Sequence, residues 1–340
     1  MGFYHVSRAF AAPIIIIIAT LTTPAYGQSK VQEQTAEKLK LSKAEITQYK
    51  ALTGLVDAVT SGKESAPGDF TVAFHNHFIR STTNVFIPYV LEIGPAKPSS
   101  FPVALYVRAQ RKGAANAAAE PDFADIYFAN ANSFTSTGQD SVQLSRALAL
   151  PPGDFEVTFA IAEAPSKNTR TPPKRVVHTQ ALTVPDFSGG LTTSSIVLAR
   201  DLQAAPQQLT PQQQLEQPFT IGGQKITPAF TPTFATSAEL LFMFLVYNEG
   251  ATPAGKPDIE VGYTLTRGAE AKPFAKMPNT LFNATTLPAE FNSSAGHQVL
   301  VVQGVPLASL APGDYKLAIA ITDKTNNGAI TRTIPFTVIP

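Results

Sequence analysis

The sequence contains neither cysteine nor tryptophan among its 340 residues. Without cysteine, the chain has no disulfides, no thiolate nucleophiles and no cysteine-ligated metals. Charged residues are also scarce, at 15 % of the chain, compared with about 25 % in typical soluble proteins. The formal net charge of +1 gives no field that would attract nucleic acid or an anionic membrane surface. We therefore expect no nucleic-acid partner.

The common catalytic signatures are absent from the sequence as well. It has no G-x-S-x-G nucleophile elbow, no H-E-x-x-H motif and no glycine-rich phosphate loop after a strand. Acidic residues are few, and Asp154 and Asp314 lie beside turns, where aspartates usually bond the turn itself. We predict a protein with no enzymatic activity, no catalytic residues and no cofactor.

The first 27 residues are typical of a signal peptide. A polar head with His5 and Arg8 precedes the apolar run AFAAPIIIIIATL, and small residues follow at Ala25 and Gly27. We predict cleavage after Gly27 and a periplasmic or secreted bacterial protein, with an uncleaved anchor as the alternative. A membrane helix needs about 20 apolar residues, so we expect no stable membrane span once the segment is removed.

Residues 28–67 form an N-terminal segment in which one amphipathic helix is predicted at 42–61. Ser42 and Glu45 match a capping box, and Gly62 suits the end of a helix. Apolar residues recur at helical spacing on one face, at Ile46, Tyr49, Leu52, Leu55, Val56 and Val59. Two interpretations are open: the helix docks a partner, or it covers an exposed face of the domain that follows it.

From about residue 68 the hydrophobic period changes from that of a helix to that of strands, and a phrase is repeated. LPPGDFEVTFAIAE and LAPGDYKLAIAITD both alternate apolar with polar or small residues after a Pro-Gly-Asp turn. AFHNHFIRSTTNVFIPYV also matches AFTPTFATSAELLFMFLV, at an offset that places Phe86 on Phe242 and Arg111 on Arg267. Val142 falls on Val302 at a slightly different offset, and LTV at 182–184 falls on FTV at 336–338. The sequence thus predicts two copies of one domain.

The fold class predicted is all-β, with tandem antiparallel β-sandwiches of immunoglobulin-like or fibronectin-like type preceded by one amphipathic helix. Short strands with frequent turns favour sandwiches, and no crossover helices of the kind that a parallel sheet needs are visible. The boundaries predicted are 68–200 for the first sandwich and 218–340 for its internal repeat. The Gln- and Pro-rich stretch 201–217 is predicted to be the linker.

Two segments of the second copy, FTIGGQKITPAFTPTFATSAELLFMFLVYN and LASLAPGDYKLAIAITDKTNNGAITRTIPFTV, carry a family resemblance. They resemble the C-terminal β-sandwich repeats of acidobacterial-type VWFA-related secreted proteins and of GWxTD-associated proteins. The resemblance covers residues 68–340 and implies the sandwich fold and an exported location. The D-x-S-x-S metal motif of a VWFA domain is absent, and a GWxTD motif is impossible without tryptophan, so no functional residue is carried over.

His75 and His77 in FHNHF are the most suggestive candidates for a site. On a strand, residues i and i+2 face the same side, so the two imidazoles would be placed to chelate one metal. No acidic residue follows nearby, and threonines occupy the matching positions of the second copy. A zinc site needs three or four ligands, so we predict no metal site here, with metal binding through His75 and His77 kept as the alternative.

The function predicted is that of an exported, non-catalytic β-sandwich protein acting as a protein-interaction or structural module, with a protein partner at the cell envelope. One alternative is a metal-binding protein or metal-assisted enzyme that uses His75 and His77. A second alternative is a glycan- or ligand-binding module, although the absence of tryptophan removes the strongest stacking residue.

Overall fold

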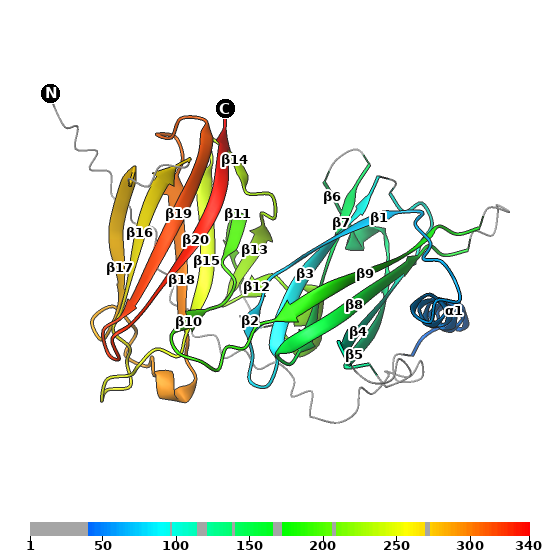
Figure 1. Cartoon of the computed structure of the whole chain (residues 1–340), viewed down its shortest axis with the longest axis horizontal. Coiled ribbons are helices and arrows are strands. Elements are labelled where there is room, and N and C mark those ends of the chain that lie inside the picture. The colour runs from blue at the N-terminus through cyan, green and yellow to red at the C-terminus, as the bar shows by residue number, and fades with distance from the viewer. Residues whose placement is uncertain are drawn as a thin grey trace. The chain divides into compact units, whose positions relative to one another are not determined.

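The computed structural model describes residues 40–95, 97–113, 121–137, 140–165, 172–205, 209–268 and 273–340. The predicted signal peptide and its cleavage site after Gly27 lie outside the described residues. The chain divides into two compact units, which Figure 1 colours along the chain from blue to red. Of the described residues, the first unit holds those up to 186 and 209–218, and the second unit holds the remainder.

The first unit is a sandwich of two antiparallel sheets with one long helix. One sheet has the order β1-β3-β7-β6, with β2 also paired to β3, and the other has the order β5-β4-β8-β9. The elements are α1 (Lys43–Thr60), β1 (Thr71–Asn76), β2 (Ile79–Arg80), β3 (Val85–Gly94), β4 (Val103–Arg111), β5 (Phe123–Ala129), the 3-10 helix η1 (Ala131–Ser133), β6 (Thr135–Ser136), β7 (Val142–Leu150), β8 (Gly153–Ala162), β9 (Arg175–Val184) and the short helix α2 (Pro211–Glu216).

Aromatic rings fill the space between the two sheets of the first unit. Phe74 on β1 lies 4.9 Å from the Phe159 ring on β8, and Tyr89 on β3 lies 5.7 Å from the same ring. The apolar face predicted for β8 is confirmed, because Phe155, Val157, Phe159 and Ile161 are fully buried. The strand is not half-buried as predicted, since Thr158 and Ala160 on its other face are also buried.

The second unit is also a sandwich of two sheets. One sheet joins β12-β13-β11-β15, with β10 and β18 also paired to β15, and the other has the order β14-β20-β19-β16-β17. Its elements are β10 (Thr192–Thr193), β11 (Val197–Ala204), β12 (Thr220–Ile221), β13 (Gln224–Pro228), β14 (Thr233–Ala235), β15 (Glu239–Tyr247), β16 (Ile259–Arg267), β17 (Ala275–Phe282), the 3-10 helix η2 (Ser293–Ala295), β18 (Val299–Pro306), β19 (Gly313–Asp323) and β20 (Gly328–Ile339).

The core of the second unit is built from residues of both its sheets. Phe242 on β15 meets Tyr263 on β16 edge-to-face at 5.8 Å, and Ile319 on β19 is fully buried in the same cluster. Lys316, on the opposite face of β19, is exposed. The face assignment predicted from the alternation of this strand is therefore confirmed.

The strand order in both units is that of an immunoglobulin-like sandwich, so the predicted fold class is confirmed. In such domains, one sheet carries the strand order ABED and the other is built around CFG, which is the arrangement of β1-β3-β7-β6 and β4-β8-β9. The second unit adds a tyrosine corner: Tyr315, near the start of β19, donates its hydroxyl to the Ala311 carbonyl oxygen at 2.8 Å.

The repeated Pro-Gly-Asp phrase forms the same structural corner in both units. In the first unit, Arg111 donates to the Pro152 carbonyl oxygen at 3.2 Å, and Thr183 donates to Asp154 at 2.6 Å. The corresponding bonds in the second unit run from Arg267 to Pro312, at 3.4 Å, and from Thr337 to Asp314, at 2.8 Å. The aspartates thus hold the neighbouring strand. Common descent of the two units stays a prediction.

One part of the sequence alignment between the copies is wrong. Phe242 points into its core, whereas Phe86 lies an odd number of residues from Tyr89 and so points away from its core. A shift by one residue turns every side chain of a strand to the other face. In addition, β14, which pairs parallel with β20, is aligned with residues 77–79, where Ile79 of β2 pairs antiparallel with β3.

The predicted domain boundaries also differ from the structure. The division lies between residues 186 and 187, not after 200, because β10 and β11 pair with β15 of the second unit. The predicted linker 201–217 is not a simple connection. Its start belongs to β11, whereas residues 209–217 are grouped with the first unit, in which α2 packs against β7. The stretch is therefore an excursion, in which the chain leaves the second unit after β11, contributes residues 209–218 to the first unit and then returns to the second.

Candidate functional site

The structure places His75 and His77 on one face of the first unit, as their spacing predicts. His75 is paired with Val90 on β3, and the His77 N–H donates to the Pro88 carbonyl oxygen at 3.0 Å. Because Phe74 points into the core, both imidazoles point to the outer face of this sheet. Burial, and to a smaller extent the neighbouring His75, lowers the pKa of His77 to about 4.

A lowered pKa keeps His77 neutral near pH 7, which is the form that binds metals. Within the described ranges, however, no group of three or more His, Cys, Asp or Glu residues is arranged to hold a metal ion. His178 lies on β9 in the other sheet, where it contacts Gln180 at 3.5 Å, and His297 accepts a bond from the Asn292 N–H in the second unit. His178 is therefore on the other sheet from the His75–His77 pair, and His297 is in the other unit.

The helix α1 covers the outer face of the β5-β4-β8-β9 sheet (Figure 1). The predicted capping box is confirmed, since Glu45 N–H donates to Ser42 Oγ at 3.3 Å and Ser42 N–H donates to Glu45 Oε2 at 2.8 Å. The buried face of the helix (Leu52, Leu55 and Val56) packs on Ala104, Tyr106, Ile126, Ala160 and Val177. Each large apolar side chain buried in this way contributes about 1.5–3 kcal/mol. Of the two interpretations left open by the sequence, the helix as a cover is the one observed.

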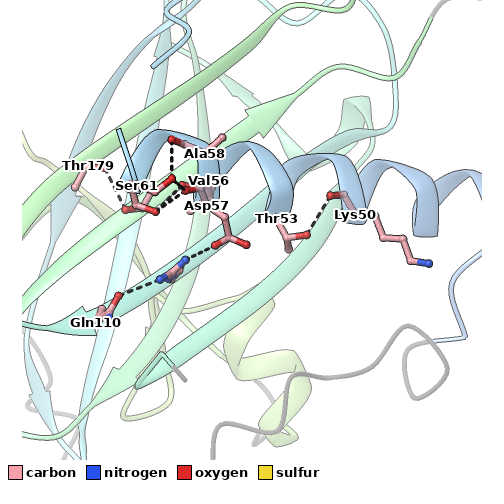
Figure 2. A network of polar contacts seen from close by, with 11 residues as sticks. Lys50, Thr53, Val56, Asp57, Ala58, Ser61, Gln110 and Thr179 are labelled. Atoms are coloured by element: carbon pink, nitrogen blue, oxygen red, sulfur yellow. Dashed lines mark hydrogen bonds and ion pairs between the residues drawn. The ribbon is translucent and has the colours of Figure 1, made fainter. Parts of the chain in front are cut away.

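Polar contacts fix α1 on the sheet near both of its ends, and Figure 2 shows those around Asp57 and Gln110. Arg108, buried beneath the helix, donates to Asp57 Oδ1 at 2.8 Å and to Gln110 Oε1 at 3.0 Å. Nearer the start of the helix, Gln48 Nε2 donates to the Glu163 carbonyl oxygen at 3.2 Å. Because the Asp57 carboxylate is exposed, solvent screens the ion pair, which fixes the helix orientation more than it adds stability.

A buried ion pair, missed by the sequence analysis, links the two sheets of the first unit. Arg146 on β7 is 4 % exposed and lies 3.4 Å from the Asp125 carboxylate on β5. The guanidinium also stacks over the Tyr127 ring, 4.0 Å from its centroid. Burial raises the pKa of Asp125, and Arg146 partly opposes that rise. The sequence does contain a signal for this pair. Alternate residues of a strand face the same side, so Arg146 faces the core together with Leu144 and Leu148.

The Tyr89 hydroxyl belongs to the same buried group. Burial raises the pKa of Tyr89 above its ordinary value, and Arg146 moderates the effect. The Nη1 atom of Arg146 is buried and has no hydrogen-bond partner among the described residues. The group therefore ties β3, β5 and β7 together at a desolvation cost.

In the second unit, the face that corresponds to the one under α1 is exposed. The pairing Glu260 with Thr322 is equivalent in register to the pairing Ala104 with Ala162 in the first unit. Many side chains on this face, hereafter the threonine face, are small and uncharged: Gly262, Thr264, Thr266, Ala318, Ala320, Thr322, Thr331 and Thr333. Glu260, Lys276 and Lys316 lie on the same side of the sheet, toward its ends and its β17 edge. Ala320, Thr322, Thr331 and Thr333 are exposed, and the other four small residues are partly buried.

No family model and no curated protein matches this chain. Among solved structures it is similar to trypsin-activated alpha-2-macroglobulin from Escherichia coli, with 9 % identity and a TM-score of 0.24. It is also similar to a mutant Salmonella alpha-2-macroglobulin, with 14 % identity and a TM-score of 0.23. In both cases 82 % of this chain is covered, and the match spans 16 % and 15 % of those much longer chains. In the described part of the chain, no helix has the length and apolarity needed to cross a membrane.

Proposed function

We propose that the protein is an exported, non-catalytic β-sandwich protein that acts as a protein-interaction or structural module at the bacterial cell envelope. The observation that carries the proposal is the contrast between equivalent sheet faces. α1 occupies this face in the first unit, whereas the threonine face of the second unit is exposed. Export rests on the signal-peptide pattern that ends at Gly27, and the family resemblance supports it.

The chemistry of the threonine face favours a protein surface as the partner. Its threonine hydroxyls can donate and accept hydrogen bonds with polar groups of a partner. Its threonine methyl groups and alanines favour close contact with apolar groups of the same partner. Because the side chains around Ala320 are small, a partner backbone can approach the sheet closely there. A partner sheet or helix with short polar and apolar side chains meets these requirements.

Site-specific photocrosslinking in the producing cells tests this proposal. A photoreactive residue at Ala320, in the threonine face, should give a discrete adduct with another protein. The same group at Lys50, on the exposed side of α1, is the matched control and should give none. Equal labelling at both positions, or none at Ala320, would contradict the proposal. Mass spectrometry of the same preparation tests whether the mature chain begins after Gly27.

A further inference from the structure

The strand β9 forms one edge of the β5-β4-β8-β9 sheet and exposes part of its backbone. At its start, the Val177 N–H donates to the Pro67 carbonyl oxygen at 3.1 Å, and the Arg175 carbonyl oxygen accepts from Asp69 at 3.1 Å. The backbone groups of these odd-numbered residues therefore point away from β8. In an antiparallel strand the direction repeats every second residue, so those of Thr179, Ala181 and Thr183 point outward too.

These three outward residues have no backbone partner beyond β9 in the ranges that the structure describes. Their side chains are exposed. The hydroxyls of Thr179 and Thr183 bond to Thr158 and Asp154 of the adjacent strand, which ties β9 to β8. The result is an accessible row of N–H and C=O groups of the kind that pairs with another strand.

The equivalent strand of the second unit is protected against such pairing. β20 has the same register, since Lys316 pairs with Pro335 where Glu156 pairs with Ala181. Proline has no N–H, so the outward row of β20 lacks a donor at the position of Ala181. Between residues 178 and 184, β9 carries neither proline nor Lys, Arg, Asp or Glu. Proline and charged side chains are the features that usually protect an edge strand from pairing with another strand.

We propose that two copies of this chain associate through antiparallel pairing of β9 with β9, centred on Ala181. In this arrangement Ala181 lies opposite its counterpart, and Thr179 lies opposite Thr183 of the second copy. Each of these pairs exchanges two N–H···O=C bonds. Threonine pairs across strands are favourable, and no like charges face each other. The contact is isologous and closes after two copies, and it is independent of the threonine face.

A charge-swap experiment on the full chain tests the proposal by sedimentation velocity over a concentration series. The wild-type protein should show a dimer whose fraction rises with concentration. Ala181→Lys and Ala181→Glu each place like charges opposite each other, and each should weaken dimerisation about ten-fold or more. Mixing the two variants should restore a heterodimer. Because Ala181 is exposed, circular dichroism should show both variants folded like the wild type.

The matched controls are Thr333→Lys and Thr333→Glu, which change an exposed residue in the outward row of β20. They should leave the dimer unchanged. A wild-type protein that stays monomeric throughout the series would overturn the proposal. Dimerisation that is unchanged in the Ala181 variants would also overturn it. So would the loss of the dimer in both variants if mixing them does not restore a heterodimer.

Discussion

The two units share one strand order, β5-β4-β8-β9 in the first and β17-β16-β19-β20 in the second, but they stabilise and use their surfaces differently. The first unit has an outer sheet face covered by α1 and a buried Arg146–Asp125 pair between its sheets. The second unit has an exposed threonine face, an apolar core in which Met277 occupies the place of Asp125, and a tyrosine corner at Tyr315. The comparison shows that the outer face of this sheet can be covered by a helix or left exposed. It also shows that the space between the two sheets can hold an ion pair or apolar side chains instead.

The largest expected effect concerns which strands complete the second unit. We predict that a fragment 187–340 unfolds cooperatively, whereas a fragment 218–340 does not. The shorter fragment lacks β10 and β11, which leaves the edge of β15 unpaired and Phe242 with fewer neighbours. Thermal unfolding followed by circular dichroism distinguishes them. Equal cooperative transitions in both fragments would show that β10 and β11 are dispensable.

The next effect tests the difference between the two cores. Asp125→Met gives the first unit the residue found at the matching position of the second, but it leaves Arg146 buried without its partner. We expect a loss of about 3 kcal/mol in the free energy of unfolding, measured by urea titration. The double variant Asp125→Met, Arg146→Val should recover most of this loss, because it removes the buried charge. A double variant no more stable than the single one would contradict this account.

A smaller effect, dependent on pH, belongs to the first unit. The pKa of His77 is about 4 in the folded protein, compared with about 6.5 when unfolded. The unfolded chain therefore binds more protons, and stability falls as the pH drops through this range. From pH 7 to pH 5 the loss is about 2 kcal/mol. His77→Gln should abolish this contribution in urea titrations at the two pH values.

His75→Gln is the matched control for that experiment. Because burial is the main cause of the lowered pKa of His77 and His75 is the lesser one, this variant should reduce the pH dependence only slightly. If the two variants flatten the pH profile equally, burial is not the dominant cause.

The smallest effect concerns the tyrosine corner. Tyr315→Phe removes the hydrogen bond to the Ala311 carbonyl oxygen and gives the second unit the residue that the first has at Phe155. We expect a loss of about 1 kcal/mol in the free energy of unfolding. Thermal or urea unfolding of the fragment 187–340 measures it. A cost near zero would mean that water satisfies the carbonyl equally well.

The sequence predicts well those features in which local pattern and structure agree. The capping box at Ser42, the apolar faces of β8 and β19 and the Pro-Gly-Asp corners are confirmed at the expected residues. The capping box and the Pro-Gly-Asp turns depend on residues close together in the chain, and β19 alternates between buried and more exposed residues. Such a strand has only one register that buries its apolar side.

The alignment error arises in strands that are apolar on both faces. β3 is buried on nearly every residue, and β15 is almost as apolar, so alternation gave no information on which of their side chains face the core. The boundary error has a different cause. The Gln- and Pro-rich composition of 201–217 is typical of a linker, yet pairing of β11 with β15 is a long-range contact that composition does not report. The Arg146–Asp125 pair depends on two strands brought together by the fold.

The excursion that carries α2 has a consequence for the order of synthesis. The strands β1 to β9 of the first unit emerge as one continuous stretch, but the segment 209–218 that belongs with them follows β10 and β11 of the second unit. A nascent chain that has reached residue 205 therefore holds every sheet strand of its first sandwich and still lacks α2 against β7. The first unit is begun first, yet it can be completed only after synthesis of the second is under way.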